Sequence, residues 1–516
     1  MANYSASDLN ALNAAFSRTL TENGMNGALF PSVFTDALGT SLDTVLSLTV
    51  SSTGSDAVGA ANFPNAPFAT VQGALNALPK HISSAVTITV GAGNFAGFNV
   101  DGFTFDYNAL GSYLLIQGTM AAVTPATGSA TGTASAGATQ SGTTFATLTD
   151  AAALWTVNNF VGKYVQLTGG LGATLAGAVN YNTYYPIVSN TGTVITIAGN
   201  WGSAGAPNGT TTYAIVDQAT FITSAAPLNT VSGFGASDSY VRIMNCSGSM
   251  STIRQQLEIK AFGSSSAAKI NFSFLSPSIL PTITACSLDT TTSTPITIFD
   301  GAHAQVRNCQ IGGAGQTSGA LVNIGSSTGL AGNVSVADSF LRAGVTTAGP
   351  HVAVLGTAHL GLLRCRFEGG TTSTSGVINF RDNAACGYMN QCQIDGNSLA
   401  RVGIFAGVGS NSAASGASGP VGFTVLTTKF ANCLTAVVAN GPLTLLEMRT
   451  GVVFDTCTNG INVSRGARVQ YGSTNSVATV TNEIIVDGAA AALVTDLRAA
   501  TPKVLKDSDY FTAIYE

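Results

Sequence analysis

The segment RCRFE (364–368) is one of seven short stretches that share a pattern and decide the fold. The other six are ACSLD (285–289), NCQIG (308–312), DSFLR (338–342), QCQID (391–395), TTKFA (427–431) and VVFD (452–455). In each stretch a small residue is followed two positions later by a large apolar residue. Side chains two positions apart point to the same face of a strand. We therefore expect seven short strands, each turning one small and one large residue toward the core.

The seven stretches define two columns of residues. The small column is Cys286, Cys309, Ser339, Cys365, Cys392, Thr428 and Val452, and the large column is Leu288, Ile311, Leu341, Phe367, Ile394, Phe430 and Phe454. Successive members of the small column are 23, 30, 26, 27, 36 and 24 residues apart. This spacing is too irregular for a helical repeat but suits one solenoid coil per repeat, with loops of varying length. Stacked coils place like residues about 4.8 Å apart, so the pattern predicts an all-β parallel β-helix.

The composition agrees with a β-solenoid. Of 516 residues 59 are glycine, 9% are charged and 45% are hydrophobic. A helical protein of this size would carry more Leu, Glu, Lys and Arg. The pairs Gly301-Ala302, Asn440-Gly441 and Asn459-Gly460 stand between apolar runs, which predicts tight corners with positive φ.

Charge and hydropathy exclude several classes of protein. The net charge is −5 and the pI is about 5.3, without a cluster of Lys and Arg, so we expect no nucleic-acid partner. The apolar residues alternate with Ser, Thr, Asn and Gly, so we expect no membrane insertion. The first residues also lack the basic and apolar regions of a secretory signal.

The cysteines and histidines do not form a recognisable metal or cofactor site. Five of the eight cysteines lie at repeating strand positions, which favours reduced, buried side chains over disulfides: Cys286, Cys309, Cys365, Cys392 and Cys433. The closest pair, Cys386 and Cys392, is six residues apart, too far for a C-x₂-C zinc motif. We expect neither a metal nor a cofactor.

Changes in pattern along the chain predict five segments. They are an N-terminal attachment or capping segment (1–50), the start of the β-helix (51–118), an inserted small β-domain (119–217), the main β-helix (218–487), and a C-terminal cap or subunit-contact tail (488–516). Ser7 and Asp8 are expected to begin a short helix that runs to about Leu20. A cap is expected at each end because an uncovered coil exposes a sheet edge.

One stretch near the N-terminus resembles a known family. The sequence PFATVQGALNALPKHISSAVTITVGAGNFAGFNV (67–100) joins a short amphipathic helix to a strand and a Gly-rich turn. It resembles the opening of pectate-lyase-like right-handed β-helices, especially those of bacteriophage tailspikes and other virion appendages. The resemblance implies a right-handed parallel β-helix. It also implies that the chain is part of the virion, which is extracellular after lysis, and that it forms a homotrimer bound to other virion proteins.

The inserted segment resembles a small β-domain found in phage β-helix appendages. The residues that carry this resemblance are Leu148, Thr149, Asp150, Trp155, Gly162, Ser189, Asn190, Trp201, Tyr213 and Ile215. Both tryptophans of the chain, Trp155 and Trp201, lie here. They are candidates for stacking against carbohydrate, and the other interpretation is that they form the core of a small domain. We expect the core role to outweigh the binding role.

The best catalytic candidates are Glu368 and Asp395. They follow the large column by one position, so they would lie on adjacent coils about 5 Å apart, with Arg342 on the coil before as a binding candidate. That separation suits the two carboxylates of a retaining glycosidase. However, outward carboxylates are common on any solenoid, and a pair alone lacks a cleft and positioning groups. A structural role for this pair is therefore the leading interpretation.

The sequence therefore predicts a structural component of a bacteriophage virion. The leading function is a tailspike-like or tail-fibre-like appendage that binds the host cell surface, with host surface polysaccharide as the partner. The alternatives are a tailspike depolymerase that cleaves this polysaccharide, a capsid head fibre or decoration protein, and a bacterial surface adhesin.

Overall fold

The computed structural model describes residues 45–487 with gaps, and 493–496, 504–507 and 512–515 beyond them. The gaps are residues 101, 106–111, 143, 172–183, 202–204, 224–228, 233–239, 249, 254–255, 264–269, 274–281, 289–293, 300–302, 314–319, 326–332, 344–348, 356–357, 370–375, 382–385, 398–401, 408–420, 442–443 and 473–474. The helix expected between Ser7 and Leu20 lies outside the described residues.

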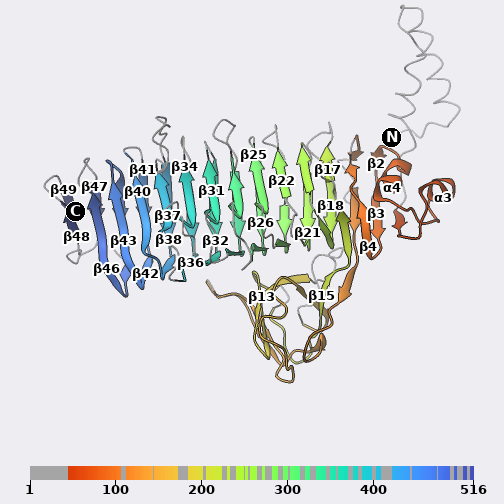
Figure 1. Ribbon diagram of the computed structural model, residues 1–516, viewed down its shortest axis with the longest axis horizontal. Helices are drawn as coiled ribbons and strands as arrows, with labels where there is room; N and C mark the ends of the chain where they lie inside the picture. The colour runs from red at the N-terminus through yellow and green to blue at the C-terminus, as the bar shows by residue number, and fades with distance from the viewer. Residues whose placement is uncertain are drawn as a thin grey trace, which may run out of the picture.

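Three long parallel sheets form a rod in which the strands of successive coils lie side by side (Figure 1). Sheet A has fifteen strands. In order they are β1 (Leu46–Val50), β3 (Ala85–Val90), β7 (Tyr113–Gln117), β18 (Tyr240–Met244), β21 (Gln256–Lys260), β23 (Thr282–Thr284), β26 (His303–Arg307), β29 (Asn333–Ala337), β32 (His359–Leu363), β35 (Cys386–Asn390), β38 (Val421–Leu426), β41 (Thr444–Met448), β44 (Arg468–Tyr471), β47 (Leu493–Asp496) and β49 (Thr512–Tyr515).

Sheets B and C complete each coil, which runs from A to B to C. Sheet B consists of β24 (Ser287–Leu288), β27 (Gln310–Ile311), β30 (Phe340–Arg342), β33 (Arg366–Glu368), β36 (Gln393–Asp395), β39 (Lys429–Ala431), β42 (Val453–Asp455) and β45 (Ser476–Val477). Sheet C consists of β5 (Asn99–Val100), β17 (Asn229–Ser232), β20 (Met250–Ile253), β22 (Ile270–Ser273), β25 (Ile296–Phe299), β28 (Val322–Ile324), β31 (Val352–Leu355), β34 (Ile378–Arg381), β37 (Val402–Gly407), β40 (Thr435–Asn440), β43 (Cys457–Ser464), β46 (Val480–Asp487) and β48 (Val504–Asp507).

The seven stretches of the repeat are the first seven strands of sheet B, β24 to β42, with the residues just before them. The large column is in register from Leu288 to Phe454, each member paired with the next. All of its side chains are buried in the core shared by the three sheets. The expected all-β parallel β-helix is therefore confirmed, together with its register.

The corner between sheets A and B is a bend through a single residue with positive φ. This residue is Asn245, Ala261, Ala285, Asn308, Asp338, Arg364, Gln391, Thr427 or Gly451 in successive coils, with φ between 43° and 69°. A residue other than glycine costs about 1–2 kcal/mol in this conformation. The cost is offset because each bend still donates its N–H to the next coil, as from Asp338 to the Leu363 carbonyl at 2.9 Å.

The small column directly follows this bend, and its side chains bond across the coils. The N–H of Cys309 donates to Ser339 Oγ at 3.1 Å, and the N–H of Cys365 approaches Cys392 Sγ at 3.3 Å. The Ser339 hydroxyl in turn donates to the Ala337 carbonyl at 2.8 Å. The column therefore needs a side chain that is small and also able to accept and donate a hydrogen bond, which Cys, Ser and Thr provide.

The expected glycine corners are only partly correct. Gly441 has a φ of 108°, as the sequence predicted. Asn459 and Gly460 instead lie inside β43, where a Cβ on Gly460 would collide with the Glu483 carbonyl of the next coil. Glycine serves close packing there and not a turn. The pair Gly301-Ala302 lies outside the described residues.

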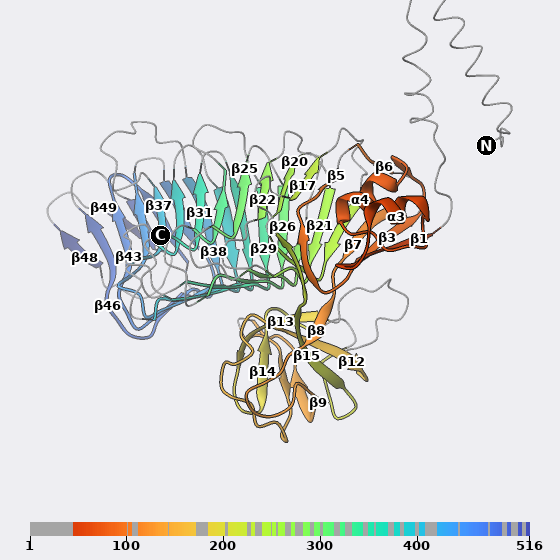
Figure 2. The same ribbon diagram turned by 45° about the vertical axis from the view of Figure 1, so that its right-hand side comes forward.

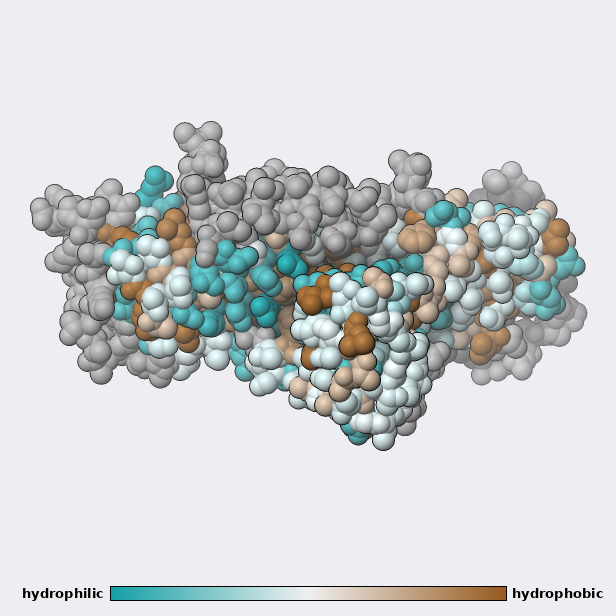
Figure 3. Space-filling view, turned by 60° about the horizontal axis from the view of Figure 1, so that its bottom comes forward, coloured by the Kyte–Doolittle hydropathy of each residue, from teal (hydrophilic) through white to brown (hydrophobic). Residues whose placement is uncertain are grey.

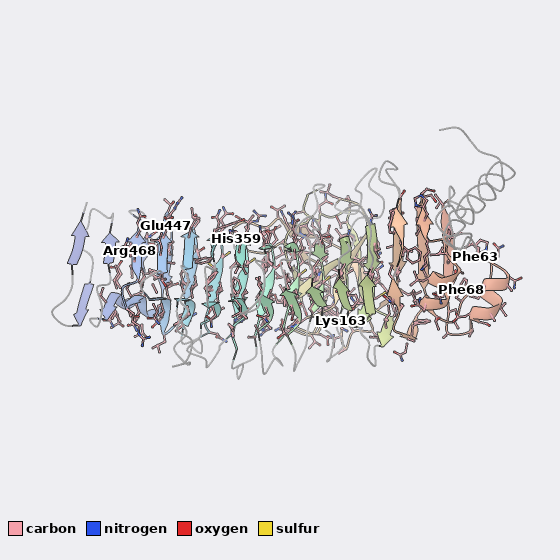
Figure 4. The ribbon with its side chains drawn as sticks, turned by 90° about the horizontal axis from the view of Figure 1, so that it is seen from above. Phe63, Phe68, Lys163, His359, Glu447 and Arg468 are labelled. Atoms are coloured by element: carbon pink, nitrogen blue, oxygen red, sulfur yellow. The ribbon has the colours of Figure 1, made fainter. Side chains whose placement is uncertain are left out.

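Two short helices cover the first coils. In α4 (Val71–Ala77) the Thr70 hydroxyl caps the first turn by accepting the Gly73 N–H at 2.8 Å, and Val71 faces the core. The carboxylate of Asp56, at the start of α3 (Asp56–Ala61), accepts the N–H of Thr70 at 2.9 Å. The helix followed by strand β3 matches the expectation from 67–100. Phe63 and Phe68 mark this end of the rod in Figure 4.

In the C-terminal segment the described strands continue the rod, and the expected cap or subunit-contact tail over 488–516 stays a prediction. Strands β47 and β49 continue sheet A, and β48 pairs with β46 of sheet C. All of these pairs are parallel and in register. The segment covers the coil at 468–487 by adding further strands in the same arrangement, because its backbone can continue the ladders that precede it.

The inserted domain is a small antiparallel unit of eight strands. They are β8 (Met120–Ala122), β9 (Thr131–Thr133), β10 (Ala136–Ala138), β11 (Thr147–Thr149), β12 (Tyr164–Gly169), β13 (Tyr184–Asn190), β14 (Val194–Ile197) and β15 (Thr212–Gln218). The chain leaves the rod after β7 and returns at β16 (Thr220–Thr223), which pairs with β4 (Gly93–Ala96) and β19 (Cys246–Gly248). The short strands β2 (His81–Ile82) and β6 (Thr104–Phe105) also pair.

The inserted domain leaves the rod at the corner between sheets A and B. Its two connections are bonded to each other, because the Ala219 N–H donates to the Thr119 carbonyl at 2.8 Å. Figure 2 shows the domain standing off one side of the rod, joined to it near β8 and β15. The inserted domain therefore takes the place of one corner between sheets A and B, and the coil on either side of it keeps its course.

One histidine lies inside the solenoid. His351 is fully buried between Leu321 and Val377 of the neighbouring coils, and its Nε2 lies 3.1 Å from the Glu368 carbonyl. Its ring meets Phe367 edge-on. Burial lowers the pKa of His351 to about 4, partly opposed by the bond to the Glu368 carbonyl. The folded protein therefore holds this ring neutral.

We predict that His351 makes the fold less stable in mild acid. The pKa of His351 is about 6.5 in the unfolded chain and about 4 in the folded protein, so between these values only the unfolded chain binds the proton. The free energy of unfolding is therefore highest above pH 6.5 and falls by about 3 kcal/mol as the pH drops to 4. The variant H351Q keeps an N–H donor and should flatten the dependence of the denaturant midpoint on pH between 7.5 and 4.5. The half-buried His359 is the control, and H359Q should keep most of this dependence. An equal slope in H351Q and the unchanged protein would contradict the prediction.

Candidate functional site

The inserted domain packs against the outer side of several coils that follow its insertion point. The hydroxyl of Tyr164 donates to the Phe262 carbonyl at 3.1 Å and accepts the Ser287 N–H at 2.9 Å. Tyr164 is fully buried, with Val216 and Ala261 against it. The Gln218 side chain also donates to the Ala261 carbonyl, at 3.1 Å. These contacts fix the domain to the rod at the corner between sheets A and B.

The contact continues along sheet B as far as Phe340. Strand β13 lies against β27, and Phe145 meets Phe340 edge-on with ring centroids 6.0 Å apart. Val188 and Ala198 complete this buried cluster. A Cβ on Gly199 would collide with the Asn308 side chain, so this glycine allows the close approach. Phe340 is the last residue of sheet B in this apolar contact.

Beyond Phe340 the outer face of sheet B becomes polar. Arg366, Gln393 and Lys429 form one in-register column that follows Phe340. Arg342, Glu368, Asp395, Ala431 and Asp455 form a second column two positions along the strands. Figure 3 shows hydrophilic residues gathered on the solenoid beside the inserted domain. We call these two columns, from Arg342 to Asp455, the polar face.

The three residues singled out from the sequence on this face lie on adjacent coils. Arg342 pairs with Glu368, and Glu368 pairs with Asp395, in the register that the repeat predicted. Neighbouring strands of a sheet are about 4.8 Å apart, so the two carboxylates occupy neighbouring positions on one face. Glu368 approaches Arg366 of its own strand, with Nη2 and Oε2 3.8 Å apart.

Asp395 and Asp455 have different hydrogen-bond partners. The Asp395 carboxylate accepts the Asn397 N–H at 3.0 Å and the Asn432 side-chain amide at 2.9 Å. Asp455 pairs with Lys429 of the preceding coil at 2.7 Å, and this bond holds the pKa of Asp455 below its usual value. The polar face therefore combines carboxylates, amides and cations, each on a fixed backbone.

The corner beside the polar face carries a stronger ion pair. Arg364 binds Asp338 of the preceding coil through two bonds, Nε to Oδ1 at 2.6 Å and Nη2 to Oδ2 at 2.8 Å. The hydrogen bonds to Asp338 raise the pKa of Arg364. This bidentate geometry is the strong form of the arginine–carboxylate pair. Arg364 and Asp338 are thus fully paired with each other, whereas the contact of Arg366 with Glu368 is single and long.

Sheet A presents a different surface. His359, Glu447 and Arg468 lie along one long side of the rod in Figure 4. Glu447 accepts two bonds from Arg449, at 2.9 and 2.7 Å, so its charge is compensated locally. Tyr388 lies exposed over Gly361 of the preceding coil, where a Cβ would touch its ring. These residues are separate from the polar face of sheet B.

The two tryptophans lie in the core of the inserted domain. Each is 4% exposed, and each indole N–H donates to a carbonyl, Trp155 to Ser129 at 2.9 Å and Trp201 to Ala138 at 3.0 Å. Trp155 packs edge-on against Phe160 and Tyr213. The structure thus gives both rings a core role. Carbohydrate stacking by either ring stays an untested prediction, and their burial weighs against it.

The other residues that carry the resemblance of this domain also have structural roles. Tyr213 donates to the Asp150 carboxylate at 2.7 Å, and burial together with this bond raises the pKa of Tyr213. Asn190 accepts the Phe160 N–H at 3.0 Å and donates to the Thr156 carbonyl at 2.8 Å. These bonds hold the loop between β11 and β12 against β13. The motif therefore specifies a fold and not a reactive group.

The repeat pattern does not indicate where the inserted domain contacts the rod, nor the column of Arg366, Gln393 and Lys429. A weak signal is present in the corner residues, because Ala261, Ala285 and Asn308 under the domain are uncharged. The next two corners, Asp338 and Arg364, carry charges that pair with each other.

Two further observations bear on the kind of site. Within the part of the chain that the structure describes, no group of three or more His, Cys, Asp or Glu side chains is arranged to hold a metal ion. The structure describes the side chains of seven of the eight cysteines, and all seven are buried and unpaired. In the same described residues, no helix is both long and apolar enough to span a membrane.

No protein-family model matches the sequence, and no curated protein matches it. Among the solved structures to which the chain is similar are three phage tailspikes. The tailspike protein gp49 of Pseudomonas phage LKA1 is 12% identical, over 78% of this chain and 74% of that chain, with a TM-score of 0.32. The tailspike gp61 of Pseudomonas phage phi297 is 14% identical, over 86% and 74%, with a TM-score of 0.26. The Gp54 tailspike of Acinetobacter baumannii bacteriophage AP22, solved with a capsular saccharide, is 10% identical, over 83% and 71%, with a TM-score of 0.22. At these values the similarity carries no argument about function.

Proposed function

We propose that this chain is a bacteriophage virion appendage that binds a polysaccharide of the host cell surface through the polar face of sheet B. The observation that carries the proposal is the in-register array of polar side chains between Arg342 and Asp455, with at least one on each of five successive strands and the buried Ala431 as its one apolar member. An extended polymer can contact such an array coil by coil. A place in the virion and a homotrimer are part of the proposal and come from the resemblance of 67–100.

The chemistry of the polar face suits a carbohydrate. Gln393 and Lys429 supply donors, while Glu368 and Asp395 supply acceptors, which matches the alternation of hydroxyl groups along a sugar chain. The side chains are held by a continuous hydrogen-bonded ladder, so little backbone order is lost on binding. A shallow face needs several weak contacts in a row, and the coil repeat provides them.

We expect the chain to be part of a phage particle, with the tail tip as its position. The measurement is electron microscopy of particles from the producing culture with a gold-labelled antibody against this chain. Label on the capsid would favour a head fibre or decoration protein. Label on cells without particles would contradict the virion assignment and favour a surface adhesin.

We expect the purified chain to bind at least one polysaccharide on an array of bacterial capsular and O-antigen polysaccharides. The double variant Q393A/K429A should lose at least about 10-fold in affinity, because two contacts worth about 1 kcal/mol each are removed. The matched control is R449Q, which alters an arginine outside the polar face and should bind normally. Absence of binding to any polysaccharide, or a loss in R449Q alone, would contradict the proposal.

A depolymerase is the second candidate function. The specific observation in its favour is the pairing of Glu368 with Asp395 on adjacent strands. In a retaining glycosidase one carboxylate attacks the sugar while the other donates a proton, and the two groups are about 5–5.5 Å apart.

If this candidate is correct, the chain should release oligosaccharides from the polysaccharide that it binds. E368Q and D395N should each reduce product release by at least about 100-fold while binding persists, because amides cannot attack or donate in these roles. Reducing-end assays and mass spectrometry of the products would measure this. E447Q, on sheet A, is the control. Product release that survives in both amide variants would exclude this pair as the catalytic groups.

A further inference from the structure

Two arginines at the edge of the polar face lie next to a single carboxylate. Arg342 pairs in register with Glu368, and Phe340 of the same strand pairs with Arg366. Arg342 and Arg366 are therefore diagonal neighbours on one face, about 7–8 Å apart at the backbone, which is within reach of long side chains. Only Glu368 lies between them on these two strands. Two positive charges and one negative charge leave this block with a net charge of +1.

The carboxylate does not engage either arginine strongly. The contact of Arg366 with Glu368 is 3.8 Å long and uses one nitrogen, and about a third of each side chain is exposed. The neighbouring corner has a bidentate ion pair for comparison, in which Arg364 binds Asp338 through two short hydrogen bonds. Arg366 and Arg342 thus retain donor groups that a second anion could use.

The block also stands directly beside the inserted domain. The Arg366 guanidinium lies 6.0 Å from the centre of the Phe340 ring, whose other neighbour is Phe145 of that domain. The end of the polar face nearest the domain is therefore positive, while its far end carries Asp395 and the compensated pair of Lys429 with Asp455. The protein as a whole carries a net charge of −5, so this positive block is a local exception.

We infer that Arg342 and Arg366 bind an anionic substituent of the polysaccharide, a sugar carboxylate or a phosphate, next to the inserted domain. Arginine presents donors in a planar fork that matches both groups bidentately. Glu368 balances part of their charge when no ligand is bound. This inference rests on the proposed function, because it names the chemical class of the ligand at the same face.

The test is an array that carries carboxylated, phosphorylated and neutral bacterial polysaccharides in parallel. The unchanged chain should bind acidic members at least 10-fold more tightly than neutral ones of similar linkage. R342Q and R366Q should each remove most of this preference, and R342K and R366K should keep part of it, because a point charge remains without the fork. R449Q makes the same change of charge outside the polar face and should leave the preference unchanged. Circular dichroism would establish that each variant is folded.

The outcomes separate this inference from the proposed function. A preference for acidic polysaccharides that is lost in R342Q and R366Q supports the inference. The acidic polysaccharide that the unchanged chain binds most tightly then shows whether the anion is a carboxylate or a phosphate. Equal binding of neutral members, or acidic preference that survives both glutamine variants, overturns the inference but leaves polysaccharide binding in place. Absence of binding to every member overturns both.

Discussion

The hydrogen bond that crosses the coils at the corner between sheets A and B is the interaction on which the rest of the structure depends. The chain bends there through one residue with positive φ, and the next N–H donates to a thiol, hydroxyl or amide of the following coil. A buried N–H without a partner costs about 1–3 kcal/mol, and the corner bend recurs in successive coils from Asn245 to Gly451. Burial raises the pKa of Cys286 and Cys392, so these thiols stay protonated and can donate as well. The small column is therefore selected by hydrogen bonding as much as by size.

This constraint explains why the sequence predicts the register of sheet B so closely. A residue that must be small and polar, followed two positions later by one that must be large and apolar, can be recognised without knowing the loops between repeats. The pairing of Glu368 with Asp395 follows from the same alignment. Where another side chain accepts the corner N–H, the small residue of the repeat need not be polar. Val452 has no polar group, and its N–H instead donates to the side chain of Asn475, at 3.0 Å.

The parts that sequence reasoning did not predict are contacts between distant segments. Tyr164 meets Phe262 across 98 residues, and neither position has a periodicity that points to the other. The roles of Trp155 and Trp201 were open because an indole suits both a small core and a sugar. For the C-terminal segment the change in composition left a cap and a subunit-contact tail open, and it did not indicate that strands β47 and β48 continue the ladders.

The inserted domain limits the polar face at one end and so makes its two ends different. Without it, sheet B would present similar coils along its length, and a polymer could slide from one register to the next. The docked domain covers the coils up to Phe340, so the first accessible positions on sheet B are Arg342 and Arg366. The packing of β13 on β27 and the hydrogen bond at the Ala261 corner hold the domain at this boundary. A fixed boundary at the end of a repeating face can set the register of an extended ligand in the same way that the corner bonds set the register of the coils.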